Sequence, residues 1–438
     1  MTKYLSPLNT AMQSHKEILS DKLWLVYLIV LIEAILSLIF FPESISQQVD
    51  SASFIITLER YEWLNPWSWI GSFRTPVYPI FYGFCRLFRF MPPYMSVIFF
   101  QWVIFGISVC YLNRISRLII SSVSVRKLIL FIYVLYPGFY ECNNLIMSES
   151  TCMCIVVFLI YALFMLMATR ASKYAIWSGL WLSVLLLLKP AMIFLLVILL
   201  VGWLLYLFKD KKTALKGLIS TIAGSLIIFA YMGGFYYKYG WFASSTVSDY
   251  NVEHNLRFFH LDNLPYEDPY LMDATSEGLE ALKKLTPFQR HELVTNNLIH
   301  VKSEYASLML KNISTLWRSR AFDWRFVMGA MSFYLTPEMG ALCIILIIYS
   351  CLLIFSLSTR RRQNIYPSIL LCAIWCGNFL VVWFGSFCYL GGYGRLMQPV
   401  APVFLLIVGQ LCSLFSRTRS LQEILSLKTS QPIDQPNC

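Results

Sequence analysis

Long apolar runs alternate with polar segments along the chain, and this alternation is its dominant pattern. A helix needs about 20 mostly apolar residues to cross the hydrocarbon core of a bilayer. By this criterion the pattern predicts an all-α polytopic membrane protein with about ten transmembrane helices. The predicted spans are residues 23–41, 95–112, 127–139, 149–168, 174–188, 191–208, 214–236, 338–357, 366–387 and 396–415.

Two polar segments, 42–94 and 238–337, are much longer than the others. The pattern therefore predicts a transmembrane core over residues 1–237 that includes a first outer loop at 42–94. A periplasmic cap loop follows at 238–337, then C-terminal transmembrane helices at 338–416 and a cytoplasmic tail at 417–438. The first 22 residues are polar and the first apolar run is of spanning length. We therefore expect an uncleaved first helix rather than a signal peptide.

Both outer segments contain helical patterns of their own. Residues 51–63 place Phe54, Leu58 and Tyr61 on one side of an amphipathic helix, and tryptophans crowd the stretch that follows. Pro76 and Pro79 suit the first turn of the next helix, where backbone N–H groups have no partner. In the second segment, residues 275–285 form a short helical pattern. Thr-Pro-Phe-Gln at 286–289 resembles a capping box, and an amphipathic stretch runs from there to residue 317. Interfacial helices and a small helical cap are therefore predicted.

Composition and charge agree with a membrane protein. Hydrophobic residues make up 58% of the 438 residues and charged residues only 13%, against about 25% in soluble domains. With ten spans, the Lys and Arg clusters of the short loops all fall on the side of the amino terminus, which predicts cytoplasmic amino and carboxyl termini. These clusters also account for most of the net charge of +11, which therefore gives no reason to expect nucleic acid. The 12 cysteines show neither a disulfide framework nor a zinc pair outside the apolar runs.

Three cations stand at the outer edges of predicted spans, where the positive-inside rule disfavours them: Arg74, Lys189 and Arg395. Each has an ordinary alternative, such as a snorkelling arginine or a loop lysine. A functional interpretation is that they bind a phosphate, which arginine pairs with bidentately. Asp50 follows the first span and is either a helix N-cap or a general base. Together, three cations and a loop acid suit a lipid-linked phosphate substrate handled on the outer leaflet.

Other polar residues could contact such a substrate. Glu59 lies in the same loop as Asp50, and Tyr78 follows Arg74. Glu149 begins a span, where a favourable interaction with the helix dipole is the alternative explanation. His254 and His260 could bind a metal, although a loop histidine pair at this spacing is more often structural. Glu33, inside the first span, is an intramembrane acid to which the sequence assigns no partner.

The order of these motifs resembles the GT-C superfamily of membrane glycosyltransferases. An acid follows the first span in Asp-Ser-Ala-Ser-Phe at 50–54. Arg-Thr-Pro-Val-Tyr-Pro at 74–79 is similar to a family element, as are Ser-Glu at 148–149, Leu-Leu-Lys-Pro-Ala at 187–191 and Gly-Gly-Tyr-Gly-Arg at 391–395. The superfamily includes protein O-mannosyltransferases, aminoarabinose lipid A transferases and polyprenyl-phosphate-sugar-dependent transferases. In size and organisation the chain also resembles phage-type O-antigen glucosyl transferases.

The resemblance implies a fold and an activity. The fold would be a GT-C-like bundle in the bacterial inner membrane. The activity would be an inverting transfer of a sugar from a polyprenyl-phosphate donor to an acceptor hydroxyl on a lipid-linked surface polysaccharide, at the periplasmic face. Asp50 would be the base, and Arg74, Lys189 and, less directly, Arg395 would bind the donor phosphate. A flippase and a polyprenyl-phosphate glycosyltransferase would be its functional partners. Phe73 precedes Arg74 where aminoarabinose transferases have an acid, so no metal or other cofactor is predicted.

Two other functions stay open at the level of the sequence. An O-antigen polymerase or ligase also has many spans and a large outer loop, but its donors are diphosphate-linked. A transporter or flippase of lipid-linked sugars is the second alternative, which the acid-bearing first loop and the helical cap fit less well.

Overall fold

The computed structural model describes residues 24–40, 49–62, 65–71, 73–258, 285–318, 339–358, 365–385 and 396–413. All regular elements within these ranges are helices. They are α3 (Trp24–Phe40), α5 (Val49–Glu59), η2 (Pro66–Trp69), α6 (Val77–Cys85), α7 (Pro93–Ile119), α8 (Val123–Leu135), α9 (Pro137–Asn144), α10 (Ser148–Thr169), α11 (Ser172–Leu188), η3 (Pro190–Ile193), α12 (Phe194–Tyr206), α13 (Lys211–Tyr239), α14 (Val247–Phe258), α16 (Pro287–His300), α17 (Lys302–Arg318), α18 (Met339–Ser358), α19 (Ile365–Gly385) and η5 (Gln398–Val400). A last helical stretch, residues 401–413, follows η5. The all-helical prediction is confirmed for this part of the chain.

Each of the ten apolar runs coincides with an observed helix, but their lengths differ. Among the described residues, four helices are long and apolar enough to cross a membrane alone: Pro93–Ile119, Ser148–Thr169, Lys211–Tyr239 and Tyr366–Phe384. Val123–Leu135 and Gly138–Asn144 would add a fifth span if this pair, bent by 52°, crosses as one unit. The other apolar helices have 10–17 residues, which is short for the hydrocarbon core. Four or five spans are therefore supported, and the count of ten is not confirmed.

The core of the bundle is α10. It packs against α7, α11, α13 and η5, and it is buried along most of its length. A helix that is apolar all round suits such a central position. Next to it, α11 and α13 approach closely because small residues face each other. A Cβ atom on Gly179 would lie 2.7 Å from the carbonyl oxygen of Ser220. The Ser183 hydroxyl bridges the two helices by donating to the carbonyl oxygens of Gly179 at 2.9 Å and Gly224 at 2.8 Å.

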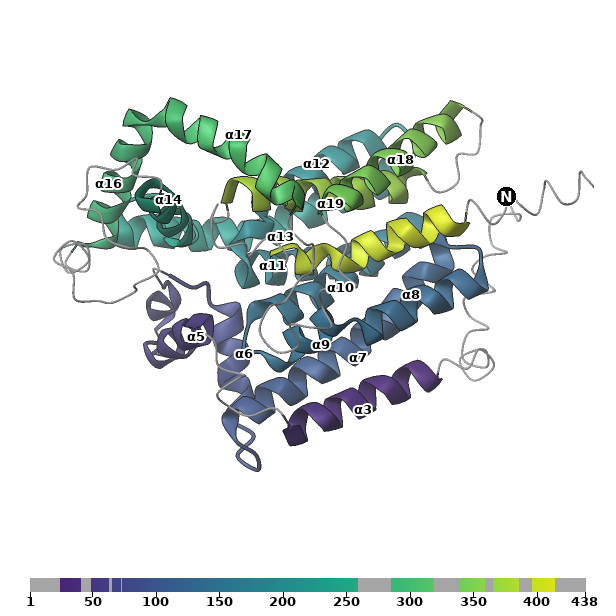
Figure 1. Cartoon of the computed structure of the whole chain (residues 1–438), viewed down its shortest axis with the longest axis horizontal. Helices are drawn as coiled ribbons and strands as arrows, with labels where there is room; N and C mark the ends of the chain where they lie inside the picture. The colour runs from purple at the N-terminus through teal and green to yellow at the C-terminus, as the bar shows by residue number, and fades with distance from the viewer. Residues whose placement is uncertain are drawn as a thin grey trace, which may run out of the picture.

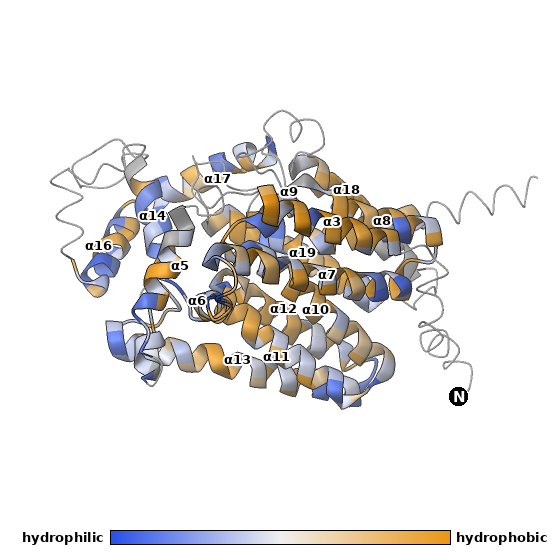
Figure 2. Ribbon diagram, turned by 90° about the horizontal axis from the view of Figure 1, so that it is seen from below, coloured by the Kyte–Doolittle hydropathy of each residue, from blue (hydrophilic) through white to orange (hydrophobic). Residues whose placement is uncertain are grey.

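Smaller, more polar helices gather at one end of the bundle. Figure 1 shows α5, α14 and α16 at the left, beyond the ends of the long helices, and Figure 2 places them at the same end from a second direction. In Figure 2 hydrophobic colouring dominates α10, α12 and α13, whereas α14 and α16 are mixed. This end is called the cap end below. It contains the described parts of the two long polar segments.

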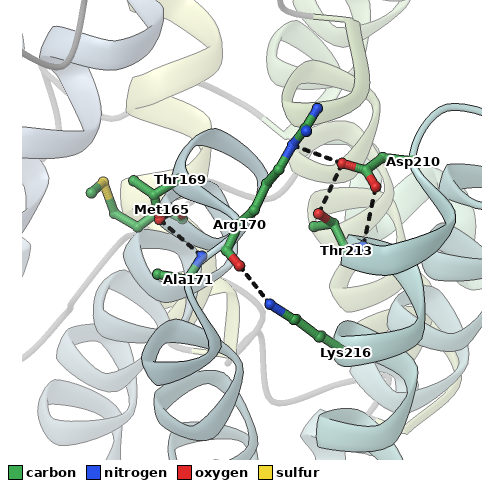
Figure 3. Close-up of polar contacts among 7 residues, drawn as sticks. All are labelled: Met165, Thr169, Arg170, Ala171, Asp210, Thr213 and Lys216. Atoms are coloured by element: carbon green, nitrogen blue, oxygen red, sulfur yellow. Dashed lines mark hydrogen bonds and ion pairs between the residues drawn. The ribbon is translucent and has the colours of Figure 1, made fainter. Parts of the chain in front are cut away.

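The opposite ends of α10, α11 and α13 are joined by polar contacts (Figure 3). Arg170 ends α10 in the left-handed conformation, with φ of 61°. Its guanidinium Nε lies 2.9 Å from the carboxylate of Asp210, and its carbonyl oxygen accepts a hydrogen bond from Lys216 Nζ at 2.8 Å. Asp210 is the N-cap of α13, since its carboxylate accepts from the N–H and the hydroxyl of Thr213.

The local predictions for the first polar segment are confirmed with shifted boundaries. The amphipathic helix buries Phe54 and Leu58 as predicted, but it ends at Glu59 instead of residue 63. Its last turn tightens, because the N–H of Arg60 bonds the carbonyl of Thr57 and the N–H of Tyr61 bonds that of Leu58. Pro76 is the N-cap of α6 and Pro79 lies in its first turn, as predicted.

In the second segment the capping box is confirmed, because Thr286 and Gln289 bond each other reciprocally at the start of α16. The predicted amphipathic stretch is two helices instead of one. It breaks at Val301, whose φ of −108° and ψ of 28° are not helical, and α17 then runs in another direction (Figure 1). The helical pattern at residues 275–285 lies outside the described residues, apart from its last residue. The domain boundaries stay a prediction.

Candidate functional site

A cavity of about 550 Å³ lies at the cap end of the bundle. Its walls come from the start of α10, the end of α11, η3, α13, α14, α17, α19 and the segment that leads into α6. It is a typical size for a ligand-binding cavity. Three of the residues singled out from the sequence line it, namely Arg74, Glu149 and Lys189. These residues are far apart in the chain, and the fold brings them to one cavity.

Arg74 is held rigidly at this cavity. Its guanidinium Nε donates a hydrogen bond of 2.7 Å to the Ser53 hydroxyl of α5. The guanidinium carbon lies 4.6 Å from the ring centroid of Phe54 and 4.8 Å from that of Phe73. A planar guanidinium stacks well on aromatic rings. The two rings and the serine therefore orient the Arg74 guanidinium at the cavity.

Lys189 and Glu149 form an ion pair in the same cavity. Lys189 Nζ lies 3.3 Å from Glu149 Oε1, and the two side chains are only 13% and 6% exposed. A lysine between two apolar helices is costly unless it finds a partner, and Glu149 supplies one. Glu149 lies in the first turn of α10, where the helix dipole also favours its negative charge. The dipole explanation of Glu149 therefore applies, and its contact with a substrate stays a prediction.

The described lining residues of the cavity carry a small positive charge. Arg74, Lys189 and Glu149 are the charged residues among its described lining residues. Two cations and one anion give a net formal charge of +1. An ammonium held against a carboxylate and a guanidinium held between two rings form a fixed binding surface for a monoanion.

A buried polar cluster sets the position of Glu149, and nothing in the sequence pattern pointed to it. Gln101 of α7 donates to the carbonyl oxygens of Asn143 at 2.8 Å and Leu145 at 2.9 Å, and it accepts from the Tyr78 hydroxyl at 2.9 Å. Ser51 of α5 donates to the carbonyl oxygen of Ile146 at 2.8 Å. These bonds join α5, α6 and α7 to the turn that begins α10. Such buried polar groups are costly unless they are paired, so the cluster fixes this turn.

The predicted base, Asp50, is the second residue of α5. Its side chain lies outside the described part of the structure. The backbone position is nevertheless fixed, because Ser51, the next residue, bonds Ile146 three positions before Glu149. The amino-terminal end of α5 is thus joined to the turn that carries Glu149 to the cavity.

The remaining predicted site residues have different positions. Tyr78 is fully buried in the core and bonds Gln101, and Glu59 is exposed at the end of α5. His254 packs its ring 4.3 Å from that of Tyr250. None of these three is among the described lining residues of the cavity. Arg395 and His260 lie outside the described residues, although Leu396, the next residue after Arg395, lines the cavity.

Polar and apolar side chains complete the cavity. α14 contributes Ser248, Tyr250 and Asn251 together with Val247 and Val252, and α19 contributes Val381, Val382 and Phe384 together with Asn378. On the other side of α14, the carboxylate of Asp249 lies 3.1 Å from His291 Nδ1, and that of Glu253 lies 2.6 Å from a guanidinium nitrogen of Arg290. Burial raises the pKa of Asp249, and the hydrogen bond and charge of His291 offset part of that rise. These pairs attach α14 to α16.

The part of the chain that the structure describes contains no group of three or more His, Cys, Asp or Glu side chains arranged to hold a metal ion. In comparisons with known proteins, no model of a protein family matches the chain, and no curated protein matches it.

Proposed function

We propose that the protein is an inverting membrane glycosyltransferase that moves a sugar from a polyprenyl-phosphate donor to an acceptor hydroxyl. The observation that carries the proposal is the cavity lined by Arg74, by the Lys189–Glu149 pair and by both apolar and polar side chains. A polyprenyl-phosphate sugar has the same three chemical parts, namely a monoanionic phosphodiester, an apolar chain and a polar sugar.

The charge of the cavity favours this donor class over a diphosphate-linked one. A net formal charge of +1 from the described lining residues complements a single negative charge. A diphosphate donor carries a second charge, which would need a further cation in a site of low dielectric. This argument supports the transferase over the polymerase or ligase alternative.

The chemistry of transfer follows from the residue types. The acceptor oxygen attacks the anomeric carbon, the bond from that carbon to the phosphate oxygen breaks, and the acceptor proton passes to the carboxylate of Asp50. The departing polyprenyl phosphate gains one negative charge. Arg74 and Lys189 would stabilise that charge where it develops, and they are fixed before the reaction begins. The base accepts the proton late in the step, so an ordinary carboxylate can serve.

The acceptor and the setting come from the resemblance of the motifs. We propose a glycan on a lipid-linked surface polysaccharide, modified at the periplasmic face of a bacterial inner membrane. In this proposal the shorter apolar helices also cross the membrane, as a GT-C-like bundle of about ten spans requires.

The test is transfer by purified protein in detergent from a defined polyprenyl-phosphate sugar. Arg74→Ala should weaken donor binding by about 10- to 100-fold, the range for loss of one charged hydrogen-bonding partner. Arg86→Ala is a matched control, since Arg86 is an exposed arginine just after α6 and is not among the residues lining the cavity. Asp50→Asn should abolish transfer and leave donor binding intact. If Arg74→Ala bound donor as tightly as Arg86→Ala does, the cavity would not be the phosphate site.

A further inference from the structure

The chain segment just before Arg74 is bonded to the cap end of α13. Lys238, in the last turn of α13, donates hydrogen bonds from Nζ to the carbonyl oxygens of Trp67 at 3.1 Å and Ile70 at 2.9 Å. The Tyr239 hydroxyl donates to the same Ile70 oxygen at 3.2 Å. A cation is favourable at the carbonyl end of a helical turn, and these two carbonyls lie in and directly after η2. Lys238 thus fixes the main chain four residues before Arg74.

Side-chain packing holds the same segment against α13. Gly234 leaves room for Ile70, since a Cβ atom on Gly234 would collide with Ile70 Cδ1. About one turn earlier in α13, the Tyr231 hydroxyl donates to the carbonyl oxygen of Gly71 at 3.3 Å. Gly71 in turn touches the main chain of Arg74, because a Cβ atom added to Gly71 would lie 2.9 Å from the Arg74 carbonyl oxygen. The contacts of α13 therefore extend through Gly71 to the backbone of Arg74.

Arg74 is thus held from two sides. Its side chain is bonded to α5 through Ser53, and the main chain that leads to it is bonded to α13. Met232 of α13 lines the cavity together with Arg74, so one helix supplies part of the wall and the support of the cation. Lys238 itself is not among the described residues that line the cavity. Its contacts reach the cavity through residues 67–71.

We infer that Lys238 is a positioning residue for the anion site, which fixes residues 67–71 and through them the Arg74 guanidinium before the donor phosphate binds. This inference rests on the proposed function. A cation that is fixed in advance loses less conformational freedom when its ligand arrives, so the ligand binds more tightly. Ordering one long side chain or a short loop on binding costs a factor of about 3 to 10 in affinity.

The experiment measures binding of sugar-free polyprenyl phosphate to purified protein in detergent. Lys238→Met keeps the length of the side chain and removes the ammonium, so binding should weaken by about three- to tenfold. Lys238→Arg keeps a cationic N–H donor and should restore most of the affinity. Lys216→Met is the matched control, because Lys216 lies near the other end of α13 and also donates to a main-chain carbonyl, that of Arg170, at 2.8 Å. The affinity of this control should equal that of the wild type.

A double-mutant cycle separates positioning of Arg74 from other roles of Lys238. If Lys238 acts through Arg74, Lys238→Met should cause no further loss of affinity in the Arg74→Ala background, whereas the effects of independent sites multiply. Tyr231→Phe is a milder second variant in case Lys238→Met does not fold. It removes only the bond to Gly71 and should weaken binding by about two- to fivefold.

The outcomes distinguish this inference from the proposed function. An affinity of folded Lys238→Met or Tyr231→Phe equal to that of Lys216→Met would overturn the inference alone. A full additional loss from Lys238→Met in the Arg74→Ala background would also overturn it, since Lys238 would then act independently of Arg74. A wild-type protein that does not bind polyprenyl phosphate would overturn the proposed function and the inference together.

Discussion

At the scale of single residues, the Lys189–Glu149 pair sets the charge of the cavity. A lone lysine would make the cavity more positive, whereas in the pair the charge of Lys189 is offset by that of Glu149. In the proposed reaction the donor carries one negative charge and the departing polyprenyl phosphate carries nearly two. With Lys189 paired to Glu149, the site therefore releases the dianionic product more readily than it would with an unpaired lysine.

This balance predicts the effect of Glu149→Gln. The variant keeps the size of the side chain and removes its charge, so the cavity would bind the dianionic product more tightly. The inhibition constant of polyprenyl phosphate should fall by about tenfold, because a charged hydrogen bond becomes available to the phosphate. Lys189→Met should have the opposite effect. Weaker product inhibition in Glu149→Gln would contradict the proposed function of the pair.

Arg170 combines an ion pair with an unfavourable backbone conformation. Its φ of 61° is left-handed, which costs an ordinary residue roughly 1–2 kcal/mol and glycine almost nothing. Arg170→Ala and Arg170→Gly both lose the exposed pair with Asp210, but only Gly relieves the backbone. Arg170→Gly should therefore have a free energy of unfolding about 1 kcal/mol higher than Arg170→Ala.

The control for this comparison is Lys173, which is exposed in the first turn of α11. At this position the order should reverse, with Lys173→Ala more stable than Lys173→Gly, because residue 173 is helical. Denaturant unfolding of the four variants measures both differences. Equal stability of the two Arg170 variants would show that the left-handed residue carries no strain.

At the scale of elements, the attachment of α14 to α16 should depend on pH. Burial raises the pKa of Asp249 above its ordinary value of 3.8. The native protein therefore holds this proton over a range in which the unfolded chain has already released it. Protonation of Asp249 therefore stabilises the folded state fully at low pH, and this stabilisation is lost as pH rises through the native pKa.

Asp249→Asn removes this titration. The stability of the wild type relative to the variant should decline as pH rises above the ordinary pKa of 3.8 and through the raised native pKa of Asp249. Thermal unfolding of both proteins in detergent at a series of pH values measures this difference in stability. Glu292→Gln, an exposed acid on the neighbouring helix, should show no such trend. A difference that rises with pH would mean that the attraction of His291 outweighs burial.

Helices were more predictable than the contacts between them. Runs of apolar residues predicted every described long helix, because the apolar pattern of a helix depends only on its own segment of the sequence. Arg74 and Lys189 were found because a cation at the edge of an apolar run is unusual. Gln101 and Asn251 were not found. Nothing in the apolar run around Gln101 shows that it bonds the turn before α10, and nothing around Asn251 shows that Asp249 faces α16. Such roles arise only when distant segments meet.

At the scale of the whole molecule, the cavity and the basic loops lie at opposite ends of the same helices. α10 has 22 residues, with Glu149 in its first turn and Arg170 directly after its last residue. At 1.5 Å per residue that is about 33 Å, close to the hydrocarbon thickness of a bilayer. The Arg170 end also carries Lys173 in the first turn of α11, Lys209 before α13, and Lys211 and Lys212 in the first turn of α13. The positive-inside rule predicts that this end faces the cytoplasm and that the cavity lies on the other side.

A protease recognition site placed at either end of α13 tests this orientation. α13 passes the length and composition criteria for a span on its own, so the two sites should lie on opposite sides of the membrane. A site inserted between Trp241 and Phe242 should be cleaved in intact spheroplasts of a bacterial host. One inserted between Phe208 and Lys209 should be cleaved only after lysis. Both sites should be cleaved in detergent, which controls for accessibility. Cleavage at 208–209 in intact spheroplasts would place the basic loops outside and the cavity inside, where a lipid-linked donor could not meet a periplasmic acceptor.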